Sequence, residues 1–201
     1  MKRCFQSLTS ENIIKEMNII PTSIPEVLII EPKVFKDHRG LFFEAWSQKE
    51  FDGKVRRICF VQDNESYSRY GVIRGLHFQR GKYAQSKLIS VVSGSIWDVA
   101  VDIRKGSPTF GKHIAVELSD DNHRQLFIPK GFAHGFSVLS ESAVVRYKCD
   151  EYYAPGQEAG IAFNDPALGI DWRLPEDSMI LSSKDSSFPL LSEADEFLDF
   201  Q

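Results

Sequence analysis

Short apolar runs separated by turn residues fill this chain from Ile24 onward, and they constrain its fold more than any other feature. Runs rich in Val, Ile and Phe recur at roughly ten-residue spacing and end at Gly, Pro, Asn or Asp, as in all-β proteins. Helical periodicity is confined to Ser47–Phe51 and the two ends of the chain. The pattern predicts an all-β sandwich, jelly roll or barrel with a few short peripheral helices.

The predicted strands are Val27–Ile30, Arg57–Gln62, Val72–Gln79, Lys87–Val92, Ser95–Ile103, Ile114–Leu118, Leu126–Ile128 and Ala143–Cys149. Ser93-Gly94 separates two of these strands, which is typical of a β-hairpin. Turns are expected at Asp37–Gly40 and at Pro129–Gly131, and a polar loop is expected at Asp63–Ser66.

Residues 19–201 are expected to form a single domain, because nothing in them resembles an interdomain linker and their number suits one sizeable core. Residues 1–18 differ in texture, since Thr9 or Ser10 is a candidate N-cap for a short amphipathic helix. We treat this stretch as an extension without an assigned function. From Pro175 the chain is mostly irregular, and this tail is expected to pack against the barrel.

Charge and cysteine content exclude several classes of protein. A net charge of −4 lacks the basic excess that binds nucleic acid through its backbone. The three cysteines include no Cys-x-x-Cys pair, which argues against a disulfide framework and a zinc knuckle and suits a reducing compartment. No run approaches the ~20 apolar residues of a membrane span, and the N-terminus lacks a signal-peptide core. The sequence predicts a soluble cytoplasmic protein that binds neither nucleic acid nor membranes.

The segment Val72–Gln79 places Arg74 and His77 inside an apolar, β-branched run, and Lys87 follows close behind. Polar side chains interrupt such a strand where they face a cavity or solvent. His77 is therefore the first candidate for proton chemistry, although a lone histidine is more often a hydrogen-bonded core residue. An ideal strand would place Arg74 and His77 on opposite faces. Both can line one cavity only if a bulge at Gly75 bends the strand.

Tyr147 is a second candidate, because strand alternation places it on the opposite face from its two charged neighbours. In Ala143–Cys149, Arg146 and Lys148 share one face and should meet solvent, so Tyr147 should point inward. An inward tyrosine serves either as an ordinary core residue or as a proton donor.

The sequence does not decide the roles of three further residues, the pair Asp98 and Asp102 and the histidine His134. Asp98 and Asp102 share one face of Ser95–Ile103, and if that face is inward they need partners such as Arg74 or Lys87. If it is outward, they are ordinary surface acids. His134 lies between glycines in the motif from Pro129 to Phe136, where a structural role in a tightly specified backbone is about as well supported as a site role.

Two histidine-bearing segments in a small β-barrel suggest a cupin, so metal binding must be considered. Metal-binding cupins carry a His-x-His pair on one strand, but here Gln79 stands two residues after His77, and His134 stands alone. Lone histidines do not supply the three or four protein ligands that a transition metal normally takes. We expect no metal site, and a metal-dependent cupin dioxygenase is disfavoured.

Several motifs lie in a fixed order along the chain: Val72–Gln79 with Lys87, Asp98–Arg104, Ser107–Gly111, Ile128–Phe136 and Asn164–Trp172. Together they closely resemble the dTDP-4-dehydrorhamnose 3,5-epimerase family. The resemblance runs from Ile24 to Leu191, and so many motifs in the right order make it far more specific than one short pattern. It implies a jelly-roll, cupin-like barrel, a homodimer with shared active sites, and no metal or organic cofactor.

The resemblance also implies a reaction, the conversion of dTDP-4-dehydro-6-deoxy-D-glucose to dTDP-4-dehydro-L-rhamnose by inversion of C5 and C3. A proton next to a ketone is removed when the enolate is stabilised and a base sits on one face, and inversion needs a donor on the other face. By the resemblance, His77 is the base and Asp185 orients its imidazole. Lys87 would stabilise the enolate oxygen, and Tyr147 would be the donor.

Binding residues follow from the same resemblance. Arg74 would hold the diphosphate, to which its planar fork is suited. The remaining implied contacts are Arg39, Gln62 and Asn64 to the nucleotide, Tyr152 or Tyr153 stacked on the thymine, and His134 as a supporting residue lining the site. Phe42 and Glu44, with Arg39, would reach into the site of the partner subunit.

Two alternatives to the double epimerase remain. A mono-epimerase, or an isomerase of a related 4-keto sugar nucleotide, would share the same catalytic residues. A non-catalytic barrel that binds sugar nucleotides should have lost the base or the donor, and this chain keeps both His77 and Tyr147.

Overall fold

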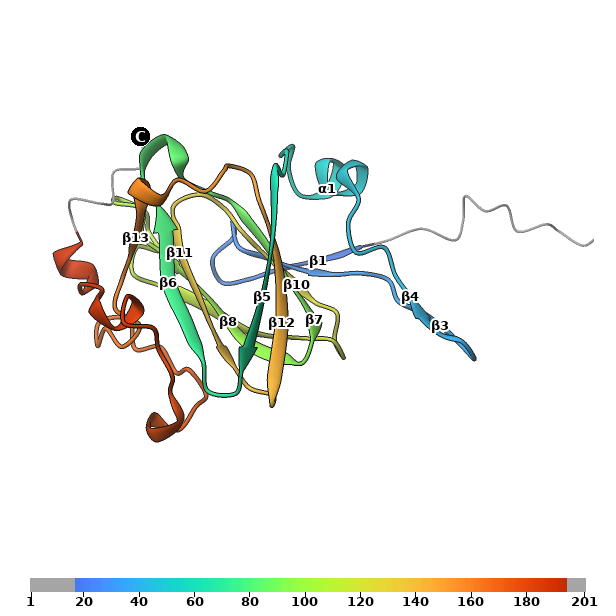
Figure 1. Cartoon of the computed structure of the whole chain (residues 1–201). Coiled ribbons are helices and arrows are strands. Elements are labelled where there is room, and N and C mark those ends of the chain that lie inside the picture. Colours follow the sequence, from blue (N-terminus) through green and yellow to red (C-terminus); the bar gives the residue numbers. More distant parts are fainter. Residues whose placement is uncertain (1–16, 195–201) are drawn as a thin grey trace, which may run out of the picture.

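The computed structural model describes residues 17–194, and its strands form two sheets that pack face to face (Figure 1). The six-stranded sheet has the order β1 (Asn18–Pro21), β2 (Leu28–Glu31), β10 (Gln125–Ile128), β7 (Lys87–Ser93), β12 (Ser142–Cys149) and β5 (Gln62–Arg69). The five-stranded sheet has the order β13 (Glu158–Gly160), β6 (Ile73–Gln79), β11 (Phe132–Val138), β8 (Ser95–Asp102) and β9 (His113–Ser119). The predicted all-β, jelly-roll architecture is confirmed.

Two smaller elements flank the sheets. The hairpin of β3 (Phe35–Asp37) and β4 (Gly40–Phe42) projects away from the body of the molecule (Figure 1), and its turn is the one expected from the sequence. The helix α1 (Gln48–Lys54) begins where the Ser47 hydroxyl accepts a hydrogen bond from a first-turn N–H group. Phe51 of α1 is fully buried against the outer face of the six-stranded sheet, and the predicted helix at this position is confirmed.

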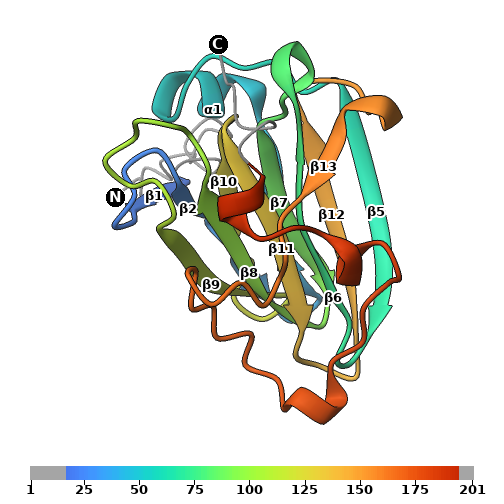
Figure 2. The ribbon, with the colours of Figure 1, turned by 90° about the vertical axis from the view of Figure 1, so that its left-hand side faces the viewer.

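Apolar side chains from both sheets fill the space between them. Strand alternation on β8 turns Ile96 and Ala100 toward this inner core, while Val99 and Val101 pack on the opposite face. That opposite face is covered by residues 161–194, which run across the outside of the five-stranded sheet (Figure 2). The central strands of this sheet are therefore buried on both faces.

The covering segment is mostly irregular and includes the short 3-10 turns η4 (Glu176–Ser178), η5 (Asp185–Ser187) and η6 (Leu191–Glu193). Two other turns, η2 (Gly81–Tyr83) and η3 (Pro155–Gln157), lie at loops. Trp172 and Leu191 anchor the segment in the second apolar cluster, and the backbone of Ile180 bridges to Val72 beside β6. This packing places Asp185 next to β6.

The prediction for β5 is wrong. A strand was expected at Arg57–Gln62 and a loop at Asp63–Ser66, but the strand begins at Gln62 and includes the supposed loop. The physical reason is that β5 is an edge strand with two polar faces. One row of its side chains meets solvent, where Asp63 and Glu65 form ion pairs with β12, and the other row faces a polar cavity.

The predicted hairpin between Lys87–Val92 and Ser95–Ile103 is also wrong, because β7 and β8 belong to different sheets. A single residue, Gly94, turns the chain from one sheet to the other with a φ of 82°. A side chain at this position would collide with the carbonyl oxygen of Ser142. The two strands that flank Ser93-Gly94 therefore form a corner between the sheets. The local sequence does not distinguish such a corner from a hairpin within one sheet.

The sequence does not predict β11, where only a tightly specified backbone was expected around His134. Pro129–Gly131 does form a turn, but Phe132–Val138 is a fully buried strand at the centre of the five-stranded sheet. Strand β1 was also not predicted. The helix predicted in residues 1–18 falls almost entirely outside the described residues.

Candidate active site

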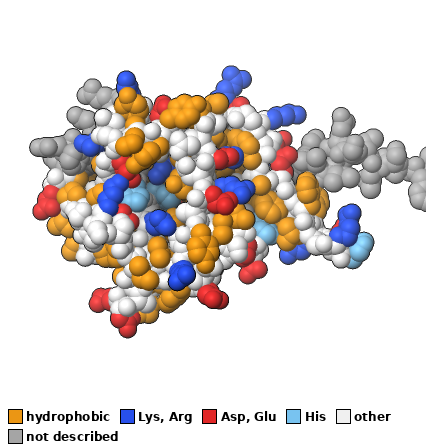
Figure 3. All heavy atoms as spheres, in the orientation of Figure 1, with side chains coloured by type: hydrophobic (Ala, Val, Ile, Leu, Met, Phe, Trp, Pro, Cys, Tyr) orange, Lys and Arg blue, Asp and Glu red, His pale blue; other side chains and the backbone are white. Residues whose placement is uncertain are grey.

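A cavity of about 370 Å³ opens between the two sheets, and Figure 3 shows histidine and basic surface in a hollow on this face of the molecule. Its walls come from β5, β7 and β12 on one side and from β6 and β11 on the other. The predicted site residues that line it are Gln62, Asn64, Arg74, His77, Lys87, His134, Tyr147 and Tyr153. Residues scattered over half the chain therefore meet in one place.

His77 and Asp185 form a close pair at this cavity. The distance between His77 Nε2 and Asp185 Oδ1 is 2.7 Å, although the two residues are 108 positions apart. Asp185 is buried, and its backbone N–H donates to the hydroxyl of Ser182. Burial alone would raise the pKa of Asp185, but the hydrogen bond and charge of His77 outweigh burial and hold the pKa below its usual value. The ring of Phe188 packs edge-on against the imidazole, with the ring centroids 5.6 Å apart.

Strand β6 is irregular between Arg74 and His77, and this brings both side chains to the cavity. Arg74 and His77 are three positions apart, whereas their partners on β11 are two positions apart. Gly75 has a φ of 131°, and a Cβ atom there would lie 2.5 Å from the Cα atom of Gly135. The kink expected between Arg74 and His77 is confirmed as a shift of register at this point.

Lys87 and Tyr147 stand on the wall opposite His77, on β7 and β12. Burial lowers the pKa of Lys87, while the nearby Cys149, Asp98 and Glu158 act in the opposite direction. Its ammonium group forms no hydrogen bond or ion pair with the rest of residues 17–194, so its donors are available to a ligand. Tyr147 points inward as its strand position predicts, and burial raises the pKa of its phenol.

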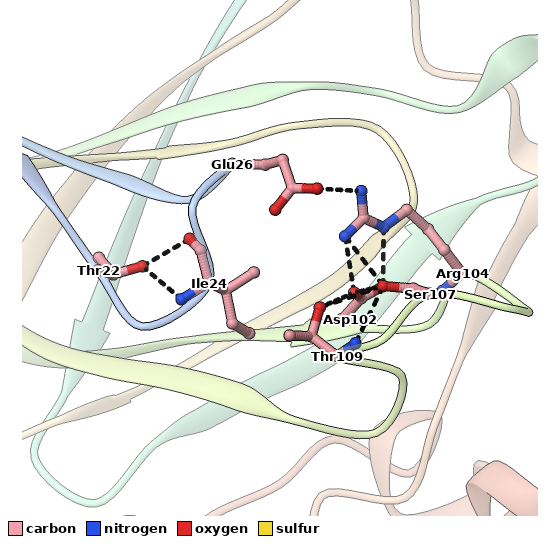
Figure 4. Close-up of polar contacts among 7 residues, drawn as sticks. All are labelled: Thr22, Ile24, Glu26, Asp102, Arg104, Ser107 and Thr109. Atoms are coloured by element: carbon pink, nitrogen blue, oxygen red, sulfur yellow. Dashed lines mark hydrogen bonds and ion pairs between the residues drawn. The ribbon is translucent and has the colours of Figure 1, made fainter.

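Asp98 and Asp102 both face inward, but neither takes the partner that was expected. Asp98 is completely buried and its Oδ1 lies 2.7 Å from Nε2 of His134, which is also buried. Asp102 accepts hydrogen bonds from Arg104 and from two hydroxyl groups in the loop that follows β8 (Figure 4). Arg74 instead donates from Nε to the hydroxyl of Ser68 at 2.9 Å.

The cavity rim contains the predicted nucleotide-binding residues of β5. The amide of Gln62 donates to Asn64 and accepts from the backbone N–H of Tyr153. Tyr153 lines the cavity, whereas Tyr152 is 64% exposed and is held through its backbone, by the amide of Gln79 and the carboxylate of Glu151. The geometry therefore favours Tyr153 over Tyr152 as the residue beside a ligand.

Comparison with known proteins identifies the family. The family model of dTDP-4-dehydrorhamnose 3,5-epimerase matches residues 21–193 of the chain. The chain belongs to this family of epimerases. It is 54% identical over 182 residues to dTDP-4-dehydrorhamnose 3,5-epimerase of Salmonella typhimurium, a match that covers 89% of this chain and 97% of that protein.

Solved structures of the epimerase family have the same fold. The crystal structure of the Legionella pneumophila 3,5-epimerase, in complex with dTDP-4-keto-L-rhamnose, is 50% identical, has a TM-score of 0.88, and covers 92% of this chain and 100% of that chain. A more distant structure, a 3'-monoepimerase from Streptomyces bikiniensis in complex with dTDP-quinovose, is 31% identical with a TM-score of 0.80, and covers 88% of this chain and 89% of that chain.

Three predicted site residues of this epimerase do not reach the cavity of their own chain. Arg39 and Phe42 lie on the projecting hairpin and Glu44 follows it, and none of them lines the cavity. Arg39 pairs with Asp37 at 2.6 Å, and Phe42 is 62% exposed.

The sequence missed several residues that line the cavity, namely Ser66, Gln85, Phe136 and Glu158. Ser66 alternates with Gln62 and Asn64, so a correct strand assignment for β5 would have found it. Glu158 accepts a hydrogen bond from the hydroxyl of Tyr153 at 2.7 Å and also contacts Lys184. No pattern in the sequence marks this carboxylate.

Within the described residues, no group of three or more His, Cys, Asp or Glu side chains is arranged to hold a metal ion. Gln79, which stands where a second cupin ligand would lie, donates to the carbonyl oxygens of Tyr83 and Tyr152. No helix between residues 17 and 194 is long and apolar enough to span a membrane.

Proposed function

We propose that this epimerase converts dTDP-4-dehydro-6-deoxy-D-glucose to dTDP-4-dehydro-L-rhamnose, with His77 as the base and Tyr147 as the acid. Family membership supports the reaction. One observation carries the mechanism: His77 lies on the five-stranded sheet and Tyr147 on the six-stranded sheet, so base and acid project from opposite walls of one cavity. A sugar ring held between the walls would lose a proton from one face and gain one on the other.

The first step uses the His77–Asp185 pair. Asp185 accepts the hydrogen bond from Nε2–H, which leaves Nδ1 of His77 as the unprotonated nitrogen. Nδ1 takes the proton from C5, and the electrons of the C–H bond move into the ketone to form an enolate. The carboxylate then stabilises the imidazolium that results.

Lys87 stabilises the negative charge that develops on the ketone oxygen. Its ammonium has no hydrogen-bond or ion-pair partner to give up within residues 17–194, and it is buried deeply enough for its pKa to be lowered. A fixed cation in such a site lowers the free energy of an enolate more than it would in water.

Tyr147 completes the inversion. Its phenol carries a proton because burial raises its pKa, and it delivers that proton to the face of C5 opposite His77. The phenolate and the imidazolium then exchange protons with solvent, which restores both groups. The same sequence of steps at C3 gives the second inversion.

The nucleotide is assigned to the outer part of the cavity. Arg74 would bind the diphosphate through the guanidinium N–H groups not used by Ser68, and Gln62 and Asn64 would contact the nucleoside. Tyr153 would stack on the thymine. These assignments are supported by the position of all four side chains in the lining of the same cavity.

A homodimer with shared active sites is part of the same proposal. The projecting hairpin (Figure 1) carries an exposed phenylalanine and a guanidinium that do not line the cavity of His77 in their own chain. Exposed aromatic groups on a protruding arm are typical of a surface buried by a partner. We assign Arg39, Phe42 and Glu44 to the cavity of the second subunit.

A single inversion is the remaining alternative, because a related solved structure is that of a 3'-monoepimerase. Solvent deuterium uptake separates the two possibilities. The keto sugar nucleotide is generated in D2O, the purified protein is added, and C3 and C5 are followed by NMR, with exchange in an enzyme-free sample subtracted. Uptake at both carbons, with the rhamno product trapped by a reductase, supports the double epimerase. Uptake at one carbon indicates a mono-epimerase, and no uptake contradicts the proposal.

A further inference from the structure

Asp98 is a buried carboxyl group for which the proposed mechanism has no use, and burial raises its pKa more than His134 and Lys87 lower it. Its side chain is completely buried on the inner face of β8, and Oδ2 has no hydrogen-bond partner within the described residues. Burying a carboxylate is costly unless it is paired, so its single strong contact is informative. That contact is with His134, which lines the cavity.

The Asp98 contact determines which nitrogen of His134 meets a ligand. Nε2 lies 2.7 Å from Oδ1 of Asp98. A carboxylate at this position can only accept a hydrogen bond, so it selects the tautomer in which Nε2 carries the proton. Nδ1 forms no hydrogen bond with the rest of residues 17–194. Burial, Lys87 and His77 all lower the pKa of His134, and together they outweigh Asp98, so the ring is neutral and Nδ1 is an acceptor.

His134 also stands beside the proposed base. In the register of β11 and β6, His134 is the direct cross-strand partner of His77. Side chains in such pairs start about 5 Å apart and point to the same side of the sheet. An acceptor at Nδ1 of His134 therefore lies next to the carbon from which His77 takes a proton.

We propose that Asp98 is a positioning residue that holds His134 with Nδ1 as the acceptor for the C3 hydroxyl of the keto sugar. This proposal rests on the proposed function. C3 is the reacting carbon that bears a hydroxyl, whereas C5 bears a methyl group. The pair would thus make the cavity selective for sugars with a hydroxyl next to the ketone, since a substrate without it leaves Nδ1 unpaired.

The kinetic test uses deuterium uptake at C5, which does not require a C3 hydroxyl. For the wild type, kcat/KM should fall about tenfold for the 3-deoxy substrate relative to the full substrate, the effect of one lost hydrogen bond. His134→Ala should be slower with the full substrate but should show no further loss with the 3-deoxy substrate. The 2-deoxy substrate is the control, and its relative rate should be the same in both proteins.

Ser137→Ala is the matched control variant. Ser137 is buried on the same strand and donates to the carbonyl oxygen of Trp172 at 2.7 Å, but it does not line the cavity. It should keep the wild-type preference for the 3-hydroxy substrate even if it lowers stability. Equal discrimination by His134→Ala and the wild type would overturn the proposal.

The tautomer can be measured without substrate. In protein labelled with [15N]histidine, the ring resonances of His134, assigned by their loss in His134→Gln, should show a protonated Nε2 and an unprotonated Nδ1. Asp98→Asn should introduce the Nδ1–H form, because a carboxamide can either donate or accept. A protonated Nδ1 in the wild type would overturn the proposal. Absence of C5 exchange in the wild type would instead contradict the proposed function, and the NMR result would still decide the role of Asp98.

Discussion

At the scale of the residue, the chemistry of this cavity depends on side chains whose surroundings shift their pKa values. Lys87 shows this most directly, because burial lowers its pKa below the usual 10.5 while its proposed role needs the charged form. As the pH rises through the lowered pKa, the ammonium is lost and so is the stabilisation of the enolate. The alkaline limit of activity should therefore lie below pH 10.5.

Replacing Lys87 tests this expectation. Lys87→Met should lower kcat by about 10² to 10³, the usual cost of removing a group that stabilises developing charge. Lys87→Arg keeps the charge and does not titrate in this range, so its alkaline limit should move to higher pH even if its rate is lower. The measurement is kcat/KM against pH with spontaneous epimerisation subtracted. An unchanged alkaline limit in Lys87→Arg would assign it to another group.

Residues differ in how far the sequence reveals them. The inward direction of Tyr147 follows from alternation with two charged neighbours, and the kink between Arg74 and His77 follows from their three-residue spacing. Asp185 cannot be found in this way. It lies in an irregular polar segment without periodicity, and its partner His77 is 108 positions away. Only the family resemblance indicated it.

At the scale of the element, two sets of close contacts fix the arrangement of strands and loops, and the first is the approach of β6 to β11. A Cβ atom on Gly75 would lie 2.5 Å from Gly135, in a backbone conformation that L-residues rarely adopt. Gly75→Ala should therefore destabilise the protein by roughly 2–4 kcal/mol and reduce activity.

Gly40 offers a matched control for Gly75. Its φ of 132° is nearly the same, but a Cβ atom there would meet nothing within 4 Å. Gly40→Ala should cost only about 1 kcal/mol for the backbone alone. Urea unfolding at equal protein concentration measures both variants. Similar losses in the two would show that the contact with Gly135 contributes nothing.

The second contact is the cluster around Asp102, which fastens the loop after β8 (Figure 4). Burial would raise the pKa of Asp102, but hydrogen bonds from Arg104, Ser107 and Thr109 outweigh burial and lower it to about 2. Because the pKa is lower in the folded state, this contribution is present above about pH 4 and is lost as the pH falls toward 2.

Asp102→Asn should therefore lower the free energy of unfolding by on the order of 2 kcal/mol at neutral pH. The difference from the wild type should narrow below about pH 4, where the wild type loses the same contribution. Denaturant unfolding of both proteins across this pH range measures the difference in their free energies of unfolding. A difference that stays constant with pH would mean that the charge of Asp102 is not what stabilises the loop.

Elements were predictable where residue types alternate along the strand, as on β8 and β12, whose charged residues all share one face of the strand. They were not predictable where that contrast is missing. β5 is polar on both faces because one face lines the cavity, and β11 is buried on both faces and interrupted by Gly135. The pairing of β7 and β8 failed for another reason, since a glycine corner between sheets and a hairpin turn have the same local sequence.

At the scale of the whole molecule, the proposed homodimer contributes parts of two chains to each complete site. A variant lacking the base, His77→Asn, and one lacking the arm contact, Phe42→Asp, should each be nearly inactive. In a mixed dimer, the subunit with an intact base receives an intact arm from its partner. Random mixing should therefore restore about a quarter of wild-type activity, because half of the dimers are mixed and each has one working site.

Co-expression of the two variants with different tags, followed by purification of the mixed dimers, measures this complementation. The purified mixed dimers should have about half of the wild-type activity, because one of their two sites is complete. A control mixture of His77→Asn with Tyr147→Phe should regain nothing, because His77 and Tyr147 line the cavity of the same chain and neither subunit keeps both groups. Failure of the first mixture, with dimers present, would contradict the assignment of Phe42 to the partner's site.

The central claim is that His77 and Tyr147 act on opposite faces of the sugar, and Tyr147→Phe tests it most directly. The measurement is the configuration at C5 together with deuterium content, followed by NMR in D2O. If the claim is right, the variant exchanges deuterium at C5 with retention, because His77 can return a solvent-derived deuteron to the face it came from, and little rhamno product forms. Inversion at the wild-type rate in Tyr147→Phe would contradict the two-wall mechanism.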